Sequence, residues 1–161
     1  MLTNDTPLEV VRFTADDFDL PALAERLTAF KASASRTPTP VTQKQLQDIS
    51  DSPTNVLLLQ IAKDGDESLV VGMVHVAVSY LEDRAHIGPI AIDKDSTPRG
   101  HGTPLMEAAI EYTKTHFPDL RRIDLTNRPS HDLEVWYGKF GFKGRTEANG
   151  DPSTVYRLPL V

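Results

Sequence analysis

Apolar residues recur along this chain at two spacings, one typical of strands and one typical of helices. Residues 8–13 form a short apolar-rich run that predicts a strand. Apolar positions then recur at roughly helical spacing over residues 18–30, with Pro21 near the start, where its missing N–H has little effect. Residues 33–40 hold two prolines and no periodicity, which predicts a loop, and a short polar helix is predicted over residues 42–50.

Three strands are predicted in the middle of the chain. Residues 56–62 are apolar, and the sequence Lys63-Asp64-Gly65-Asp66 after them is a strong turn signal. Residues 68–80 predict a long strand with alternate positions on one face, namely Val70, Gly72, Val74, Val76 and Val78. A turn at residues 82–84 then leads into a third strand over residues 85–93.

The second half of the chain predicts further strands and helices. The turn Gly100-His101-Gly102 leads into a helix over residues 103–117, which Pro118 ends. The predicted buried stripe of this helix consists of Leu105, Met106, Ala109, Ile110 and Thr113. A strand over residues 122–126 and a helix over residues 131–140 follow, and Gly141 is the expected helix stop. Closing strands are predicted over residues 142–146 and 154–160.

This order of elements predicts a single α+β domain over residues 1–161. Strands joined by short turns can pair antiparallel, whereas the strand–helix–strand step across Gly100 requires a parallel pair. We therefore expect a mostly antiparallel sheet of six to seven strands flanked by about four helices. A chain of 161 residues is long enough for one domain with a substantial core.

Composition narrows the classes of function. The formal net charge is −6 and no block of Lys and Arg stands out, which argues against a nucleic-acid partner. The absence of cysteine excludes disulfides, thiolate zinc sites and a cysteine nucleophile, and we predict no metal site. No apolar run is long enough to span a bilayer, and residues 1–11 lack the features of a signal peptide, so we expect a cytoplasmic protein with no membrane partner.

The glycine turn carries the candidate chemistry. A strand, a turn with Gly100 and Gly102, and a helix start together place unpaired backbone N–H groups where an anion can bind. Arg99 can pair with a phosphate, and Thr103 can cap the helix or offer its hydroxyl. The Walker ending Gly-Lys-Ser/Thr is absent, and Leu105 replaces the third glycine of the dinucleotide fingerprint. We therefore predict a phosphorylated ligand, with a plain tight connection as the alternative.

Two motifs resemble those of the GNAT superfamily of acetyl-CoA-dependent N-acetyltransferases. Residues 97–107, TPRGHGTPLME, align without gaps with the family motif Gln/Arg-x-x-Gly-x-Gly/Ala. About thirty residues later, the segment containing WYGKFGF resembles the family's second signature, in which a helix carries Leu-Tyr-x-Lys-x-Gly-Phe. Two motifs in this order are more specific than either alone, and the predicted element order is also similar to that of the family.

The resemblance implies a division of labour among the site residues. The backbone of Ile90, Ala91 and Ile92 would pair with the pantetheine arm of acetyl-CoA as an added strand would. The backbone N–H groups of residues 99–103 would hold the pyrophosphate. The other cofactor-binding residues implied lie in or beyond the turn: Thr97, Arg99, Gly100, His101, Gly102, Thr103 and Asn127. Tyr137 would be catalytic, because the family often uses this tyrosine to protonate the departing thiolate.

The chain departs from the family pattern at three places. Thr97 stands where the family prefers Gln or Arg, and the segment before Tyr137 is one residue shorter than in the closest patterns. Gly88 and Pro89 replace a glutamate that in many relatives helps to deprotonate the amine. Substitute bases are His75, Glu82, Asp83, His86 and His131. A water chain to bulk solvent, or an amine that arrives partly neutral, are alternatives.

Three hypotheses follow. The first is an enzyme that moves an acetyl group from acetyl-CoA to a primary amine of a small molecule or peptide, by direct attack in a ternary complex. The second is a non-catalytic acyl-CoA-binding or sensing module, suggested by the missing glutamate. The third is an unrelated domain with another phosphate ligand, such as a nucleotide. The sequence leaves polyamines, aminoglycosides, amino acids and protein N-termini open as acceptors. The first helical region, the loop after it over residues 32–42 and the turn near Asn149 are expected to select the acceptor, and the resemblance also suggests a homodimer.

Overall fold

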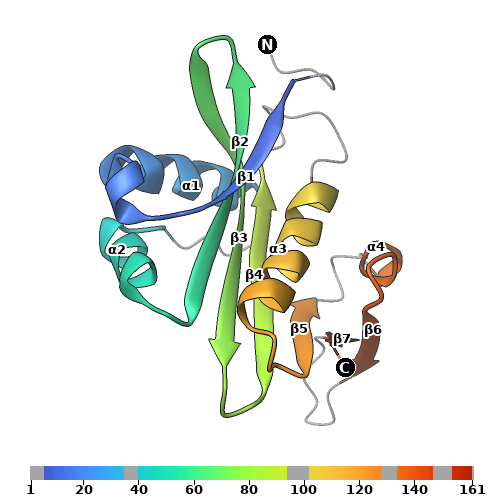
Figure 1. The fold of residues 1–161 in the computed structure, drawn as a ribbon. Helices are drawn as coiled ribbons and strands as arrows, with labels where there is room; N and C mark the ends of the chain where they lie inside the picture. The colour runs from blue at the N-terminus through green and yellow to red at the C-terminus, as the bar shows by residue number, and fades with distance from the viewer. Residues whose placement is uncertain (1–5, 35–39, 94–101, 128–133, 147–153, 161) are drawn as a thin grey trace.

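One sheet organises the protein (Figure 1). The computed structural model describes residues 6–34, 40–93, 102–127, 134–146 and 154–160. Within these residues seven strands pair in the order β1-β2-β3-β4-β5-β7-β6, and each neighbouring pair is antiparallel except β4 with β5. The strands are β1 (Leu8–Arg12), β2 (Asn55–Asp64), β3 (Glu67–Ser79), β4 (Arg84–Ile92), β5 (Arg122–Asn127), β6 (Lys143–Thr146) and β7 (Thr154–Pro159). The predicted mixed sheet with one parallel pair is confirmed.

The helices lie close to their predicted positions. They are α1 (Leu20–Ala34), α2 (Gln43–Asp51), α3 (Gly102–His116) and α4 (Glu134–Gly138), with a short 3₁₀ helix η1 (Ala15–Asp17) before α1. Helix α2 begins with a capping box, in which the Thr42 hydroxyl accepts from the Gln45 amide at 3.1 Å and the Gln45 side chain accepts from the Thr42 amide at 3.0 Å. Helix α1 extends to Ala34, into the segment predicted as a loop.

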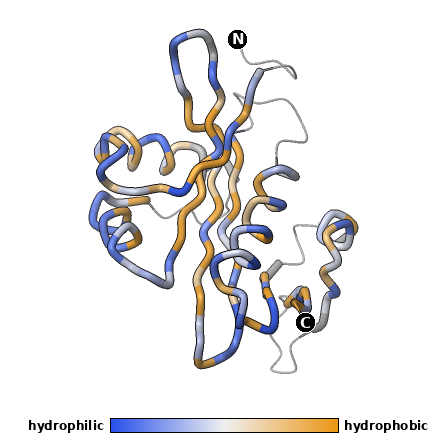
Figure 2. Tube along the Cα trace, in the orientation of Figure 1, coloured by the Kyte–Doolittle hydropathy of each residue, from blue (hydrophilic) through white to orange (hydrophobic). Residues whose placement is uncertain are grey.

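The helices cover the two faces of the sheet and bury a separate apolar cluster on each. Helices α1 and α2 pack on one face, with Leu27 and Leu46 against Leu57 and Met73 of the sheet. Helix α3 packs on the other face and buries the predicted stripe, Leu105, Met106, Ala109, Ile110 and Thr113. The hydrophobic colouring accordingly follows the central strands, while the tip of the β2–β3 hairpin is hydrophilic (Figure 2).

The prediction that alternate residues of β3 share one face is wrong at the start of the strand. The pairing register changes between Gln60 and Ile61, so that Val71 is an extra residue opposite β2. This bulge reverses the alternation of side chains. Val70 therefore packs with the α1–α2 cluster, while Val74, Val76 and Val78 pack with the α3 cluster.

Gly72 of β3 has side chains of both neighbouring strands close to its Cα. It pairs with Gln60 of β2 and with Ile92 of β4. A Cβ atom added at Gly72 would lie 2.8 Å from Cδ1 of Ile92 and 3.0 Å from Oε1 of Gln60. Because any side chain there would displace its neighbours, glycine is the residue that fits at this position of β3, opposite Ile92 at the end of β4.

Candidate active site

Strands β4 and β5 separate after a short region of pairing. Their ladder joins Arg84, Ala85 and His86 to residues 122–124, and β4 then continues to Ile92 while β5 stays paired with β7. Backbone groups of a strand alternate between its two neighbours. In the described strand pairings, some backbone N–H and C=O groups of residues 87–92 therefore have no strand partner. They lie on the side of β4 that faces away from β3, where β5 no longer pairs. This edge includes Ile90, Ala91 and Ile92, the residues expected to bind the cofactor arm.

A bulge in β4 lies beside this edge. Val74 pairs with Ile90 and Val76 pairs with Ile87, so Gly88 and Pro89 together stand opposite the single residue His75 of β3. The extra residue redirects the strand and gives Pro89 a place where its missing N–H interrupts no ladder. The bulge was not predicted from the sequence, although Gly-Pro inside an otherwise apolar strand was the signal for it.

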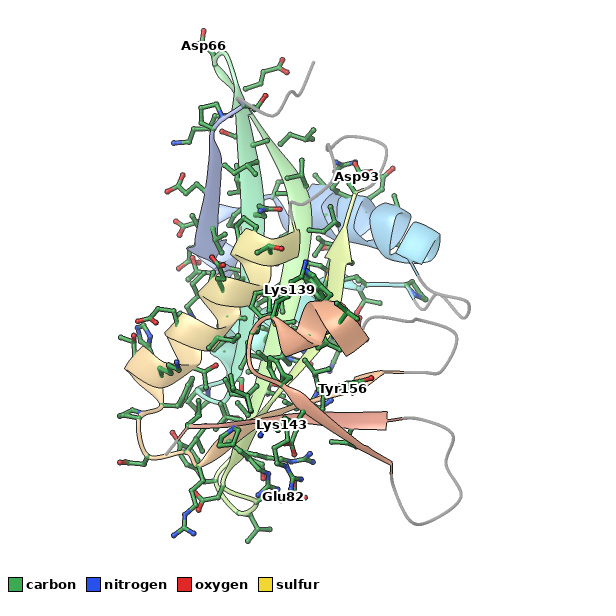
Figure 3. The ribbon with its side chains drawn as sticks, turned by 90° about the vertical axis from the view of Figure 1, so that its right-hand side faces the viewer. Asp66, Glu82, Asp93, Lys139, Lys143 and Tyr156 are labelled. Atoms are coloured by element: carbon green, nitrogen blue, oxygen red, sulfur yellow. The ribbon has the colours of Figure 1, made fainter. Side chains whose placement is uncertain are left out.

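An ion pair fixes the end of β4. Arg26 of α1 forms a salt bridge with Asp93, whose exposed fraction is 5%, and also donates from Nε to the Val70 carbonyl at 2.9 Å. The Asp93 amide donates to the Val71 carbonyl at 2.8 Å. Figure 3 shows Asp93 at this end of the strand. This ion pair was not predicted from the sequence, because its partners are far apart in the chain.

The start of α3 is attached to α4. The indole Nε1 of Trp136 donates to the Thr103 hydroxyl oxygen at 3.2 Å. A Cβ atom on Gly102 would lie 3.4 Å from Cζ2 of Trp136 and 3.9 Å from Cγ1 of Ile92, so the helix start, α4 and the end of β4 meet at one place. Helix α3 begins at Gly102, so Thr103 lies inside its first turn. Thr103 is therefore not the residue that caps the helix, which was one of its two predicted roles. The donor role of Trp136 was not predicted from the sequence.

A helix-ending turn holds Tyr137 in place. Helix α4 ends at Gly138, two residues earlier than predicted, and the chain then tightens. The Phe142 amide donates to the Tyr137 carbonyl at 3.3 Å, the Gly141 amide donates to the Gly138 carbonyl at 3.0 Å, and Gly141 has a φ of 96°. These are the bonds of a Schellman motif, which needs the left-handed conformation that glycine adopts easily. The predicted stop at Gly141 is thereby explained.

Tyr137 lies in an aromatic cluster. Its exposed fraction is 5%, and its ring centroid is 4.9 Å from that of Tyr156 and 5.5 Å from that of Trp136. Burial raises the pKa of the Tyr137 phenol from 10.0 to about 12, with a smaller contribution from Tyr156. The phenol is therefore protonated at neutral pH, where it can donate a proton or hydrogen bond but cannot act as a base.

A cavity opens on the other face of the sheet, beneath helix α2. This α2 cavity has a volume of about 360 Å³, within the range of small-molecule sites. Its apolar lining consists of Leu27, Val41, Leu46, Ile49, Leu57, Met73 and Pro89, and its polar lining of Gln45, Asp48, Asn55 and His75. The cavity thus reaches the β4 bulge through Pro89 and includes one of the predicted substitute bases, His75.

The other candidate bases lie in different surroundings. Glu82 and Asp83 lie in the β3–β4 turn and pair with Arg84 and Arg121 respectively. Figure 3 shows Glu82 far from Asp93. His86 lies on β4 within the short parallel ladder. Burial, and to a smaller extent the positive charge of Arg84, lowers the pKa of His86 below 6.5, and a nearby carboxylate partly opposes this shift.

That carboxylate is Asp124 of β5, which is 1% exposed. It accepts hydrogen bonds from Arg84, Arg122 and Arg157, the shortest being 2.9 Å from Nε of Arg157. Burial alone would raise the pKa of Asp124, but the three guanidinium groups together hold it below its usual range. Asp124 joins β4, β5 and β7 at the point where the strands still pair.

Several predicted site residues fall outside the described residues. These are Thr97, Arg99, Gly100 and His101 of the glycine turn, and the candidate base His131. For Asn127 only the backbone is described, at the end of β5, where it pairs with Thr154. Within the described ranges no group of three or more His, Asp or Glu side chains is placed to hold a metal, and no helix is long and apolar enough to cross a membrane.

Comparison with known proteins identifies a family and solved structures that are similar to this chain. Residues 21–142 match the sequence profile of the acetyltransferase (GNAT) family. A search of curated protein sequences found no match. The profile match covers β4, α3 and α4, the elements that form the candidate site.

Solved structures share the fold at low sequence identity. The ribosomal-protein-S18-alanine N-acetyltransferase from Escherichia coli is 17% identical, with a TM-score of 0.67 and coverage of 96% of this chain and 94% of the other. The PaiA N-acetyltransferase from Thermoplasma acidophilum, in complex with coenzyme A, is 14% identical, with a TM-score of 0.68 and coverage of 95% and 99%. The spermidine N-acetyltransferase from Vibrio cholerae, in complex with CoA and spermine, is 16% identical, with a TM-score of 0.68 and coverage of 95% of both chains.

Proposed function

Because this chain belongs to the acetyltransferase (GNAT) family, we propose that it transfers an acetyl group from acetyl-CoA to a primary amine. The amine belongs to a small molecule or a peptide and attacks the thioester directly while both substrates are bound. Two structural neighbours, both below 20% identity, are in complex with coenzyme A, which supports the choice of co-substrate.

The observation that carries this proposal is the separation of β4 from β5. Beyond His86 the two strands no longer pair, and the β4 edge of residues 87–92 faces the space between them. The pantetheine arm carries amide groups that can pair with such an edge as an added strand does. Ile90, Ala91 and Ile92 would bind the arm in this way, and the side chain of Asn127 would contact it from β5.

The first turn of α3 supports the position of the pyrophosphate. Helix α3 starts next to the end of β4, since a Cβ atom added to Gly102 would lie 3.9 Å from Cγ1 of Ile92. Its first N–H groups have no partner within the helix, and the helix dipole favours an anion there. We assign the pyrophosphate to the backbone of residues 99–103, with Arg99 as a charged partner and Thr97 beside it.

Tyr137 is the proposed proton donor. Bound acetyl-CoA would supply the thioester carbonyl that the amine attacks and the sulfur that leaves. Tyr137 would hydrogen-bond to this sulfur and stabilise its developing negative charge. Its pKa of about 12 keeps the proton available over the whole physiological range. The same burial that raises the phenol's pKa also raises that of a thiolate in the same site, which favours sharing of the proton.

One observation favours a second candidate, a non-catalytic acyl-CoA-binding module. Gly88 and Pro89 occupy the β4 bulge and supply no ionisable group, although many members of the family carry a glutamate on this strand. A binding module would bind acetyl-CoA through the same β4 edge but would leave the thioester intact.

The test combines binding with turnover. Calorimetry with acetyl-CoA should show binding at micromolar concentration, and a thiol-release assay with a broad amine panel should show free coenzyme A only when an amine is present. Competition with ATP separates a coenzyme A site from a general nucleotide site. No heat at high micromolar acetyl-CoA would contradict both candidates, and binding without thiol release would select the binding module.

A further inference from the structure

We propose that the face of β5, β7 and β6 opposite α3 binds an acidic side chain of the acceptor. The acceptor is then a peptide whose amino-terminal amine is acetylated and whose third residue carries the acidic group. The inference rests on the proposed function, since an acceptor is needed only if the chain transfers an acyl group. It adds the chemical class of that acceptor.

Ionisable side chains form one row across four strands. In the pairing register His86 of β4 stands beside Asp124 of β5, Asp124 beside Arg157 of β7, and Arg157 beside Lys143 of β6. Their neighbours in the chain, such as Tyr156 next to Arg157, pack with the α3 cluster. Because side chains alternate along a strand, these four residues lie on the sheet face opposite α3. We call them the charged row.

Helices α1 and α2 leave the charged row open to solvent. Figure 1 shows both helices on the side of β1 and β2, away from β5, β6 and β7. Among the described residues, the cluster that α1 and α2 bury takes no member from β5, β6 or β7. The side chains of Arg84, Arg122 and Arg157 are accordingly 30–33% exposed, and Lys143 is exposed. A ligand can therefore reach the charged row from this face.

Asp124 holds the guanidinium groups in fixed positions. Its buried carboxylate accepts hydrogen bonds from Arg84, Arg122 and Arg157, which come from three different strands. Side chains that are ordered before binding lose less conformational entropy when a ligand arrives. A planar guanidinium also matches the two oxygens of a carboxylate better than an ammonium does. Ordered and partly exposed arginines are therefore suited to bind an acidic side chain.

Among the described residues, positive charge is in excess at this face. Even with Arg157 set aside, Arg84, Arg122 and Lys143 carry three positive charges against the two negative charges listed here: Asp124 and Glu82. Lys143 also stands directly across from Arg157, where like charges destabilise a sheet. The whole chain has a formal net charge of −6, so its composition does not explain this local excess. An anionic ligand would offset the repulsion.

The charged row lies beside the expected position of the thioester. The proposed pyrophosphate site is at the Ile92 end of β4, so an arm that runs back past Ile90 ends near the bulge at Gly88. A Cβ atom added to Gly88 would lie 3.4 Å from Cε1 of His86, which places the imidazole between the bulge and the rest of the charged row. Tyr137 belongs to the α3 cluster on the other face. The acceptor and the proton donor are thus on opposite sides of the thioester.

The distance from the bulge to the charged row sets the length of the acceptor. Two residues along a strand span roughly 7 Å, and neighbouring strands are roughly 5 Å apart. An anion held over β5 or β7 therefore lies roughly 8–12 Å from an amine at the bulge. An extended peptide covers roughly 7 Å in two residues, and a glutamate side chain at the third residue adds the remainder. A free α-amino acid is too short, because its amine and carboxylate share one carbon.

The phosphates of coenzyme A are too far away to be the ligand of the charged row. His86 and Ile92 are six residues apart on β4, which corresponds to roughly 20 Å along the strand. The start of α3, where we assign the pyrophosphate, lies at the Ile92 end. A polyamine is also disfavoured, because its ammonium groups would meet Arg122, Arg157 and Lys143.

The acceptor class is tested first with the wild-type chain. The probes are tetrapeptide amides that differ only in a glutamate, glutamine or lysine at the third residue, each made with alanine, serine or methionine first. In the series with the fastest turnover, we expect kcat/KM for the glutamate peptide to exceed that for the glutamine peptide about 10-fold or more, with the lysine peptide poorest. Equal values for the glutamate and glutamine peptides would overturn the inference. So would faster turnover of 6-aminohexanoate or spermidine than of every peptide.

Reversing the charge of Lys143 tests the location of the site. Lys143→Glu makes the cross-strand pair with Arg157 attractive, so the urea midpoint of unfolding should not fall. We expect kcat/KM for the glutamate peptide to fall about 10-fold, KM for acetyl-CoA to stay unchanged, and the lysine peptide to become the better substrate of the two. An unchanged ranking of the peptides in Lys143→Glu would overturn the inference.

Lys114→Glu is the matched control for Lys143→Glu. It makes the same change of charge at an exposed position in the last turn of α3, on the other face of the sheet. We expect it to leave the ranking of the three peptides as in the wild type. An equal change of ranking in both variants would show an effect of net charge and would overturn the assignment to the charged row.

These outcomes are distinguishable from failure of the proposed function. A preference for neutral or basic peptides would refute this inference and leave the acetyltransferase function intact. If acetyl-CoA binds but no peptide is acetylated, calorimetry with the glutamate peptide in the presence of coenzyme A still measures binding at the charged row. Heat that Lys143→Glu abolishes would support the site, and absence of heat with the wild type would overturn the inference.

Discussion

The change Tyr137→Phe removes a single oxygen from the centre of the proposed site, and its effects can be worked out from the structure. Tyr137 is 5% exposed, and its pKa is raised from 10.0 to about 12 because the ionised phenol is poorly solvated there. Each pKa unit corresponds to about 1.4 kcal/mol, so ionising Tyr137 in the folded state costs roughly 3 kcal/mol more than in the unfolded chain.

This difference makes stability depend on alkaline pH. Below pH 10 the phenol is protonated in both states and the folded state keeps its full advantage. Between pH 10 and 12 the unfolded chain releases the proton while the folded protein retains it, so the free energy of unfolding falls. Relative to Tyr137→Phe, the wild type should lose about 1.4 kcal/mol by pH 11. Urea unfolding of both proteins from pH 8 to 11 measures this, and parallel curves would refute the assigned environment of Tyr137.

The same substitution tests the proposed chemistry. If Tyr137 stabilises the leaving sulfur, Tyr137→Phe should lower kcat about 100-fold while acetyl-CoA affinity by calorimetry stays within a few-fold. Tyr80→Phe is a matched control, because Tyr80 is 61% exposed and lies next to the β3–β4 turn. Wild-type turnover in Tyr137→Phe would exclude Tyr137 as the proton donor.

Three further predictions follow from packing and charge. Gly72→Ala should lower the free energy of unfolding in urea by about 1–3 kcal/mol, because its Cβ would clash with side chains of β2 and β4. Gly138→Ala is the control and should not lower it, because a Cβ there would have no atom within 4 Å; equal stabilities of the two variants would contradict this prediction. Because the pKa of Asp124 is lowered in the folded state, its ionised carboxylate stabilises the fold above about pH 4, and this contribution is lost as the pH falls. The free energy of unfolding in urea should therefore decrease less steeply at acidic pH in Asp124→Asn than in the wild type, and identical slopes in the two proteins would refute this. Trp136→Phe removes the donor to Thr103 and should weaken acetyl-CoA binding about 5-fold in calorimetry; unchanged affinity would show that this bond does not position α3.

Periodicity and turn residues were sufficient to predict most of the fold. The stripe of α3 was predicted residue by residue, because a helix packed on a sheet needs one continuous apolar face. The parallel pair of β4 and β5 followed from the need to cross over through a helix. Gly141 was predicted as a stop because a Schellman turn requires a left-handed residue, and the structure shows that turn.

The features that were missed depend on contacts between distant parts of the chain. Arg26 and Asp93 are 67 residues apart, and only the packing of α1 beside β4 brings them together. The bulges at Val71 and at Gly88–Pro89 change which side chains share a face, and a regular alternation cannot predict them. His75 was one of five candidate bases in the sequence, and only the structure placed it in the α2 cavity opposite the bulge.

The central claim is that coenzyme A adds to the sheet along the β4 edge of Ile90, Ala91 and Ile92. Hydrogen–deuterium exchange of the backbone amides, measured with and without coenzyme A, tests it most directly. We predict that exchange at residues 90–92 slows about tenfold or more when coenzyme A binds, while the amides of β1 and β2, remote from this edge, keep their rates. Saturating binding that leaves residues 90–92 unchanged and protects another strand would contradict the claim.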